Sequence, residues 1–288
     1  MIFEYINNVY YYPFGNNVDI DCSAVQGNHK MPLNRVDRDR VVSKYTDYLN
    51  INIHNGKSVN LEGVLVNDAN FVIEVSVIEF FDVFLFNRLR DIDNGFVEYL
   101  ENLSDSTDIE IYRMLVAYNQ SLMEKYSNIA EFIENSDIPK PIAVSVMVCT
   151  LDGFYLVTER PAHLAIGGGL SSVSVTGAVE VEDLKHSNPF ASCISRELRE
   201  ELNLDISMED IEFLGMGLGE RKMQPVILAN VVVDIDSKSV IHDSRNASEY
   251  TLEVEGLRAL TADELKKFVE DNNFTEIGKF HIQALIGK

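Results

Sequence analysis

The segment from Pro189 to Leu202 constrains the fold more than any other part of the chain. Apolar residues recur in it at every fourth position, from Phe190 to Leu202, and this spacing is typical of one face of a helix. Asn188 or Ser187 can serve as the N-cap, and a proline suits the first helical turn. The pattern predicts an amphipathic helix over Pro189–Leu202 that packs its apolar face on a core.

Three glutamates of this helix, Glu197, Glu200 and Glu201, stand at i, i+3 and i+4. Their carboxylates therefore project close together, beside the apolar face. Like charges at this spacing repel each other, and a hard divalent cation among them makes the arrangement favourable. For the Glu200–Glu201 pair alone, an ordinary acidic surface helix is the default interpretation. The neighbouring sequence decides between that interpretation and a metal site.

The surrounding sequence resembles the signature of the Nudix hydrolase superfamily. That signature reads glycine, five residues, glutamate, seven residues, and then Arg-Glu-apolar-x-Glu-Glu-x-Gly-apolar. The stretch Arg-Glu-Leu-Arg-Glu-Glu-Leu-Asn-Leu at Arg196–Leu204 matches the second half at every fixed position except Asn203, and Gly-Ala-Val-Glu at Gly177–Glu180 looks like the glycine loop. Asparagine is the residue that best replaces glycine in the left-handed conformation that ends a helix. The resemblance implies a Nudix-type α/β/α sandwich with a mixed sheet for residues 139–288.

The loop before the helix departs from the family pattern in length. Gly177 lies 19 positions before Arg196 (196 − 177), about five more than the pattern has. The first glutamate of the signature falls at Asp183 if the insertion follows it, or at Asn188 if it is counted back from Arg196. Its role in the family is mainly to hold the loop through the arginine. We therefore expect Arg196 to pair with Asp183 or Glu180.

The resemblance implies hydrolysis of a diphosphate linkage in a nucleoside diphosphate joined to another moiety, of the nucleotide-sugar, ADP-ribose-like or dinucleotide class. It implies magnesium as the cofactor, with manganese as an alternative, and a backbone carbonyl at Thr176 or Gly177 as an additional metal ligand. The implied site residues are Glu197, Glu200 and Glu201 for metal binding and catalysis, Gly177 for the metal, Arg196 for catalysis, Arg160 and Glu180 for the substrate, and Glu249, Glu253 or Glu255 as a further acid or base.

Two other functions share this pattern. One is a non-catalytic nucleotide-metabolite sensor, in which the domain binds the ligand and the N-terminal half transmits the signal. The complete set of three glutamates favours hydrolysis, because a sensor does not need to retain all of them. The other is an isomerase of isoprenoid diphosphates, which some relatives of the fold are. That chemistry requires additional cysteine and glutamate acid/base residues, which cannot be placed in this sequence.

Charge and cysteine content restrict the partners and the compartment. The 46 acidic and 24 basic side chains leave a net charge of −22, which repels nucleic-acid phosphates and anionic lipid. Cys22, Cys149 and Cys193 form no C-x-x-C pair, the residues Met1–Asn8 do not resemble a signal peptide, and no uncharged apolar run approaches the ~20 residues of a membrane helix. We expect a cytoplasmic protein with a small-molecule partner, and neither nucleic acid nor membrane as a partner.

The chain length of 288 residues suits two domains. Two prolines after a polar run at Asn135–Pro141 read as a linker. We therefore predict an α+β domain over residues 1–138 and the Nudix hydrolase-like domain over residues 139–288, with an α+β fold class for the whole chain. Before the linker, the expected elements are strands at Leu61–Val66 and Asn70–Ile78, an undecided stretch at Phe80–Leu89, and a helix at Asp108–Glu134 with a buried stripe that includes Met114.

After the linker, hydrophobic patterning predicts a run of strands and one further helix. An Asp-Gly pair at Asp152–Gly153 predicts a hairpin turn, and Thr261 with Glu264 forms a capping box that opens a helix. The expected strands are Ile142–Thr150, Gly153–Glu159, Ser171–Val175, Ile211–Met216, Val226–Ile235 and Leu252–Leu260.

The N-terminal domain contains no catalytic pattern. The aromatic residues Tyr10, Tyr11, Tyr12 and Phe14 suggest a surface that packs on something. We expect this half to contact the hydrolase domain or a second copy of the chain, and so to select substrates or to form a dimer. A homodimer is the default, since it is the commonest soluble oligomer.

Overall fold

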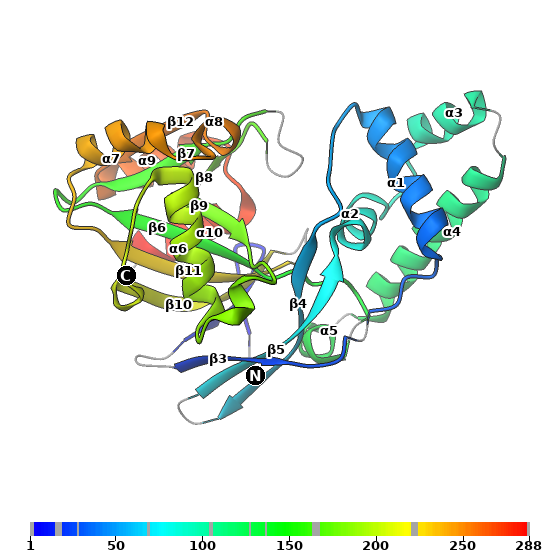
Figure 1. The fold of residues 1–288 in the computed structure, drawn as a ribbon, viewed down its shortest axis with the longest axis horizontal. Coiled ribbons are helices and arrows are strands. Elements are labelled where there is room, and N and C mark those ends of the chain that lie inside the picture. Colours follow the sequence, from blue (N-terminus) through cyan, green and yellow to red (C-terminus); the bar gives the residue numbers. More distant parts are fainter. Residues whose placement is uncertain are drawn as a thin grey trace. The chain divides into compact units, whose positions relative to one another are not determined.

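The chain forms two compact units, seen in the computed structural model that describes residues 3–14, 19–27, 29–67, 70–103, 106–126, 128–135, 137–162, 168–219 and 224–286 (Figure 1). Unit 1 comprises Met1–Cys22, Val66–Phe71 and Ile142–Lys288, and unit 2 comprises Ser23–Leu65 and Val72–Pro141. The predicted boundary after residue 138 lies close to the change of unit at Pro141. The strands Glu4–Ile6 and Val9–Pro13, which the prediction assigns to the N-terminal domain, lie in the sheet of unit 1, whereas the strand that starts at Asp19 lies in a separate three-stranded sheet.

Unit 1 is built on a nine-stranded mixed sheet, in agreement with the predicted fold class. Strands β11 and β6 run parallel, and the other pairs of this sheet are antiparallel. The order along the sheet is β1 (Glu4–Ile6), β2 (Val9–Pro13), β10 (Ile211–Gly219), β11 (Pro225–Val232), β6 (Ala143–Cys149), β7 (Tyr155–Glu159) and β12 (Gly256–Leu260), with β8 (Ser171–Ser172) on β7 and β9 (Val175–Ala178) on β6.

The N-terminal aromatic residues are part of this sheet. Strand β2 pairs with β10, which places Tyr12 opposite Met216, and the Tyr11 hydroxyl donates to the carbonyl oxygen of Leu214 at 2.8 Å. The ring of Tyr12 stacks on Phe71, with 5.4 Å between ring centroids. These contacts supply the packing that the aromatic sequence predicts, and they lie within unit 1.

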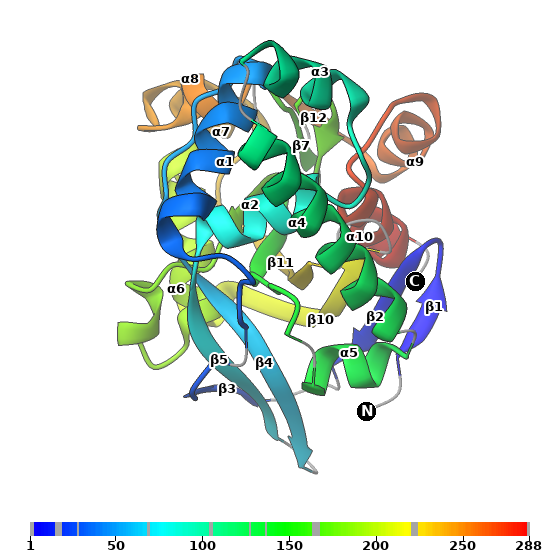
Figure 2. The same ribbon diagram turned by 90° about the vertical axis from the view of Figure 1, so that its right-hand side faces the viewer.

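Helices cover both faces of the sheet of unit 1. Along β6, Ser145 and Met147 face α10 (Glu276–Ile286) and α9 (Ala262–Asp271), whereas alternate residues point to the opposite face, which α6 (Pro189–Leu202) covers. Figures 1 and 2 show α6 and α10 on opposite sides of the strands. Helix α9 begins at the predicted capping box of Thr261. The remaining helices of unit 1 are α7 (Ser237–Asp243), α8 (Tyr250–Glu253) and the short 3-10 segments Asp183–Lys185, Met208–Asp210 and Ser244–Asn246.

A buried histidine connects α10 to the sheet. His281 has no solvent exposure, and its Nδ1 lies 2.9 Å from the Ser145 hydroxyl, while its Nε2 lies 3.3 Å from the Oδ1 of Asn230. The Asn230 amide nitrogen donates to Glu212, which leaves Oδ1 to accept from His281. Burial keeps the imidazole neutral. With its one proton on Nε2, Nδ1 accepts from the serine hydroxyl.

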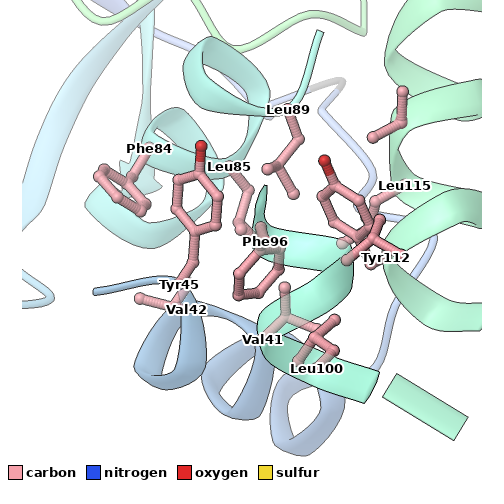
Figure 3. Close-up of a cluster of buried hydrophobic side chains, with 12 residues drawn as sticks. Val41, Val42, Tyr45, Phe84, Leu85, Leu89, Phe96, Leu100, Tyr112 and Leu115 are labelled. Atoms are coloured by element: carbon pink, nitrogen blue, oxygen red, sulfur yellow. The ribbon is translucent and has the colours of Figure 1, made fainter. Parts of the chain in front are cut away.

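Unit 2 holds a small helical core beside a three-stranded sheet. Figure 3 shows Phe96 between the rings of Tyr45 and Tyr112, at centroid distances of 4.7 and 5.0 Å. The buried Tyr112 hydroxyl accepts a hydrogen bond from the Asp93 backbone N–H at 2.7 Å, which satisfies its polar atom. The sheet has the order β3 (Asp19–Ala24), β5 (Asn70–Glu79) and β4 (Lys57–Asn67), and the helices are α1 (Arg35–Leu49), α2 (Phe80–Arg88), α3 (Asn94–Asn102), α4 (Ser106–Lys125) and α5 (Ile129–Asn135).

Several expected elements differ from the structure. The strand expected at Ser171–Val175 is divided between β8, which pairs with β7, and β9, which pairs with β6. The stretch Asp108–Glu134 is not one helix but two, α4 and α5, because the Asn128 side chain accepts from the Ala130 N–H and caps a new helix. Met114 is 44% exposed, so it does not belong to the buried stripe. The predicted strand at Leu252–Leu260 starts only at Gly256, and its first two residues, Leu252 and Glu253, belong to α8 instead.

None of the helices in the described part of the chain combines the length and the apolar composition needed to cross a bilayer.

Candidate active site

Helix α6 forms at its predicted bounds. The Asn188 side chain accepts hydrogen bonds from the N–H groups of Phe190 and Ala191, at 3.1 and 3.0 Å, and Pro189 occupies the first turn. The helix ends at Asn203, which has φ 55° and ψ 37°. Asparagine therefore takes the left-handed position that the glycine of the Nudix signature would hold, as predicted.

Two of the three helix glutamates are buried. Glu197 and Glu201 are 7% and 2% exposed, whereas Glu200 is partly exposed. Burial, together with the charges of Glu200 and Glu249, raises the pKa of Glu197 to about 7 against the opposing effect of Arg196. Burial first, and then the charge of Glu197, hold the pKa of Glu201 well above its ordinary value. The two buried carboxylates thus compete for a neutralising charge, which a proton or a cation can supply.

Gly177 on β9 provides the space that Glu197 occupies. A Cβ atom built on Gly177 would lie 1.9 Å from the carboxyl carbon of Glu197 and from its Oε1. The carboxylate therefore rests directly on the backbone of β9, as it can only where the strand residue has no side chain. This contact brings the glycine loop and the glutamates of α6 together, as the sequence predicts.

Arg196 links the glutamates to the loop before the helix. Its Nη1 donates to Oε1 of Glu197 at 2.7 Å and to Oε2 of Glu200 at 3.1 Å, and its Nη2 donates to Oδ2 of Asp183 at 3.2 Å. Burial by itself would lower the pKa of Arg196, but the neighbouring charges of Glu197 and Asp183 raise it, so the guanidinium stays charged. Oε1 of Glu180 lies 4.0 Å from Nη1 of Arg196, and the Glu180 side chain is mostly exposed. Of the two expected partners of Arg196, Asp183 makes the closer contact.

Asp183 organises the inserted loop. It is buried, and it accepts from the backbone N–H of Glu180 at 2.9 Å and from the Ser192 hydroxyl at 3.0 Å, in addition to Arg196. These three hydrogen bonds, from the loop, the helix and Arg196, explain how a loop longer than the family pattern still closes on α6.

A second segment brings further carboxylates to the end of α6. The carbonyl oxygen of Glu200 lies in the last turn of the helix, and it accepts from the N–H of Glu249 at 2.8 Å. Burial and the charges of Glu200 and Glu253 raise the pKa of Glu249. Glu255, by contrast, is exposed, and its backbone N–H bonds to the Glu159 carbonyl. The structure therefore brings Glu249 to the cluster and leaves the Glu255 side chain in solvent.

Arg160 lies inside the cluster and is largely buried. Its Nη1 donates to the Thr176 hydroxyl at 3.0 Å, and its Nη2 donates to Oε2 of Glu253 at 3.3 Å. Its charge also opposes the raised pKa of Glu201. The hydroxyl of Thr176 and the pairing of Arg160 with Glu253 were missed in the sequence, because no motif spacing connects residues so far apart in the chain.

The side chains that meet at this site suit a divalent cation in their chemistry. They present several carboxylate oxygens, which hard cations prefer, and two of the carboxyl groups have raised pKa values that a bound cation would offset. In the described ranges, however, no group of three or more His, Cys, Asp or Glu side chains is arranged as a ready metal-binding set. Arg196 instead bonds both Glu197 and Glu200.

Solved structures similar to this chain over about half of its length are Nudix hydrolases. The MutT protein from Methanosarcina mazei Go1 is 15% identical, with 50% of this chain and 91% of that one covered at a TM-score of 0.34. A NUDIX-family hydrolase from Clostridium perfringens is 16% identical, with 51% and 97% covered at a TM-score of 0.31.

A bifunctional NMN adenylyltransferase/ADP ribose pyrophosphatase from Francisella tularensis, complexed with AMP and a Mn ion, is 15% identical. The match covers 74% of this chain and 63% of that protein, at a TM-score of 0.34. At TM-scores below 0.5, these similarities say nothing about activity. No family model and no curated protein matches the chain.

Proposed function

We propose that unit 1 is a Nudix-type hydrolase that uses a divalent cation to cleave the diphosphate linkage of a nucleoside diphosphate joined to another moiety. The observation that carries the proposal is the gathering of Glu197, Glu200 and Glu201 at the end of α6, against Gly177 and beside Glu249. Buried carboxylates that repel each other cost stability unless a cation or a binding function compensates for them. This cost supports a functional site over an ordinary helix face.

Glu197, Glu200, Glu201 and the backbone carbonyl of Gly177 would hold the cation. Mg²⁺ is the proposed ion, with Mn²⁺ as the alternative, because both prefer oxygen ligands. When bound, the ion supplies Lewis-acid polarisation of the phosphoryl oxygens. A cation is also what allows an anionic diphosphate to approach a chain with a net charge of −22.

The chain's own residues would prepare the attacking water and hold the site together. We assign the general base to Glu249, which would take the water proton on a carboxylate oxygen. Its raised pKa supports this role, since a base works best with a pKa near the working pH. Glu253 is less suited to it, because Arg160 already pairs with its carboxylate. Arg196 and Asp183 would position the loop against α6.

The substrate class is a nucleotide sugar, an ADP-ribose-like compound or a dinucleotide, and the test is a screen of these compounds with the full-length chain. Hydrolysis is followed as metal-dependent release of phosphate monoesters. Glu200→Gln should lower kcat by about 100-fold or more, because it removes a charge that acts on the transition state. Glu255→Gln is the matched control and should retain the wild-type rate, since its side chain is exposed. A wild-type rate for Glu200→Gln would overturn the site.

One observation favours a second function, a sensor that binds a nucleotide metabolite without turnover. Arg196 bonds two of the three helix glutamates, and so occupies oxygens that a cation would need. Tight binding of a nucleoside diphosphate derivative, with no turnover in the presence of Mg²⁺ or Mn²⁺, would favour the sensor. Calorimetric titration of Mn²⁺ into the chain, with and without the nucleotide, separates the two functions.

We further propose a cytoplasmic homodimer in which unit 2 limits which substrates reach the site, with neither nucleic acid nor membrane as a partner. Cys22, Cys149 and Cys193 are free thiols, which supports a reducing compartment. Sedimentation equilibrium should give twice the chain mass of 32.5 kDa. A mass that stays at one chain up to high micromolar concentrations would contradict the dimer.

A further inference from the structure

Arg160 directly follows β7, and its backbone is fixed there. Its N–H donates to the carbonyl oxygen of Leu170, and its carbonyl oxygen accepts from the N–H of Gly169, both at 3.0 Å. The side chain is 13% exposed, and its guanidinium donates to the Thr176 hydroxyl on β9 and to the Glu253 carboxylate at the end of α8. The arginine is therefore anchored at its own strand and joins two further elements of unit 1.

Helix α8 is a single turn that has little packing of its own. None of its residues, Tyr250–Glu253, all of which the structure describes, is buried. Polar contacts hold both of its ends. The N–H of the N-cap residue Glu249 donates to the carbonyl oxygen of Glu200 at 2.8 Å, and the Glu253 carboxylate accepts from Arg160 at 3.3 Å. Because a one-turn helix is unstable by itself, its position depends on the contacts at its ends.

The charges of the site make the contact between Arg160 and Glu253 important for the position of α8. The charge of Glu253 raises the pKa of Glu201, whereas the charge of Arg160 lowers it. The charge of Glu253 also raises the pKa of Glu249. Without Arg160, the Glu253 carboxylate would face these two acids unpaired, and a movement of its end of α8 into solvent would relieve the repulsion. The ion pair therefore holds α8 at the site.

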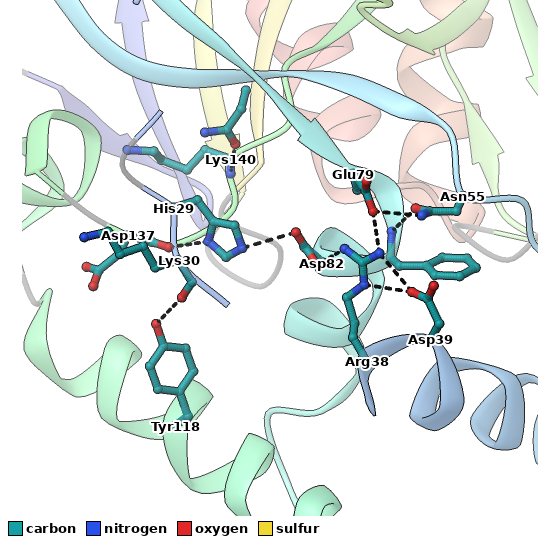
Figure 4. A network of polar contacts seen from close by, with 12 residues as sticks. His29, Lys30, Arg38, Asp39, Asn55, Glu79, Asp82, Tyr118, Asp137 and Lys140 are labelled. Atoms are coloured by element: carbon teal, nitrogen blue, oxygen red, sulfur yellow. Dashed lines mark hydrogen bonds and ion pairs between the residues drawn. The ribbon is translucent and has the colours of Figure 1, made fainter. Parts of the chain in front are cut away.

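A buried arginine in unit 2 joins elements in the same manner. Figure 4 shows the guanidinium of Arg38 among the carboxylates of Asp39, Glu79 and Asp82, which belong to α1, the end of β5 and α2. A guanidinium suits such a junction, because its N–H donors point in several fixed directions within one plane. Arg38 thereby joins α1 to β5 and α2, as Arg160 joins the end of β7 to β9 and α8.

We propose that Arg160 is a positioning residue, which holds α8 against the site and so places Glu249 beside Glu200. The inference rests on the proposed function, in which Glu249 takes the proton of the attacking water. It gives Arg160 a structural partner, Glu253, in place of the contact with the substrate that the family resemblance implies. A misplacement of about 1 Å can slow a reaction about 100-fold, so the loss of Arg160 should lower kcat.

Amide hydrogen exchange, measured by mass spectrometry on the full-length chain, tests the positioning without any turnover. In Arg160→Gln, the amides of residues 249–255 should exchange at least about tenfold faster than in the wild type, as expected for the loss of a charge-assisted hydrogen bond. Glu253→Ala removes the same ion pair through a side chain that is 31% exposed, and should give the same increase.

Arg258→Gln is the matched control for the exchange experiment. Arg258 pairs with Glu159 on the neighbouring strand, and its side chain is 54% exposed. The amides of residues 249–255 should therefore exchange within about twofold of the wild-type rate in this variant. Unchanged exchange of the same amides in Arg160→Gln and Glu253→Ala would overturn the proposal, even if the chain is a hydrolase.

Steady-state kinetics separate positioning from substrate binding. Arg160→Gln and Glu253→Ala should each lower kcat at least about tenfold and leave KM within about threefold. The double variant should be within about threefold of either single variant, because the two residues act as a unit. A raised KM in Arg160→Gln, together with an unchanged kcat in Glu253→Ala, would overturn the proposal and assign Arg160 to the substrate. Absence of hydrolysis by the wild type would refute the proposed function, and hydrogen exchange would still decide whether Arg160 holds α8.

Discussion

Unit 1 should lose stability as the pH falls below 7, because His281 is buried in its neutral form. Burial lowers the pKa of His281 from 6.5 to about 3. The unfolded chain therefore binds a proton at His281 between pH 6.5 and pH 3, and the folded chain does not. The contribution is fully present above pH 6.5 and is lost as the pH falls.

The size of this effect follows from the two pKa values. At pH 5, protonation of the unfolded chain at His281 stabilises it by RT ln(1 + 10^1.5), about 2 kcal/mol, against about 0.2 kcal/mol at pH 7. The variant His281→Gln keeps a polar side chain near Ser145 and Asn230 but does not titrate in this range. Urea denaturation of both chains, followed by circular dichroism and tyrosine fluorescence at pH 7 and pH 5, gives the double difference. The wild type should lose about 2 kcal/mol more than the variant.

Carboxylates also titrate between pH 7 and pH 5. Their effect on stability is the same in the wild type and in the variant, so it cancels in the difference between the two chains. His242→Gln is the matched control: its side chain is 79% exposed, so it should lose as much stability between pH 7 and pH 5 as the wild type does. The prediction is wrong if the wild type and His281→Gln lose the same free energy of unfolding between pH 7 and pH 5, within about 0.5 kcal/mol. The folded chain would then take up a proton at His281 as readily as the unfolded chain.

Two further predictions concern the candidate active site. Gly177→Ala should weaken Mn²⁺ binding by about tenfold or more in calorimetry, because the new Cβ would occupy the place of the Glu197 carboxylate. The free energy of unfolding should change little, since the flexible Glu197 side chain can move. Undiminished Mn²⁺ affinity would contradict the role of this contact. Asp183→Asn should lower the free energy of unfolding by about 2 kcal/mol, because it removes the buried negative charge that pairs with Arg196; a loss below about 0.5 kcal/mol would show that Asp183 does not hold the loop.

The part of the site that lies on one helix was predictable from the sequence. Helical periodicity, a capping asparagine and a proline fix the bounds of α6, and helical spacing alone places Glu197, Glu200 and Glu201 together. The left-handed end at Asn203 follows from the conformational tolerance of asparagine. The helix bounds, the placement of the glutamates and the left-handed helix end all depend on interactions between residues close in the chain. Local sequence patterns can therefore predict them.

The parts that depend on distant residues were not predictable. Glu249 reaches the site because its N–H finds a free carbonyl of α6, and Glu253 because Arg160 pairs with it. Neither contact can be predicted from the spacing of residues in the sequence, because each joins residues that are far apart in the chain. The linker shows the same limit: Pro139–Pro141 reads as an exposed connection, yet Lys140 is fully buried, and its ammonium donates to the carbonyls of Phe132 and Ile133 at the end of α5.

The membership of β2 in the sheet of unit 1 has a consequence for the order in which the protein assembles on the ribosome. Val9 of β2 pairs with Gly219 of β10, so the chain grows by 210 residues (219 − 9) between the synthesis of Val9 and that of its partner. At about 5–20 residues per second, this takes roughly 10–40 s. Unit 2 ends at Pro141, so all of it is made before β10 is complete, and throughout the interval the aromatic strand β2 stays without β10 as its neighbour. The nascent chain must shield Tyr10–Tyr12 from other strands until β10 emerges, since an unpaired aromatic edge is a template for aggregation.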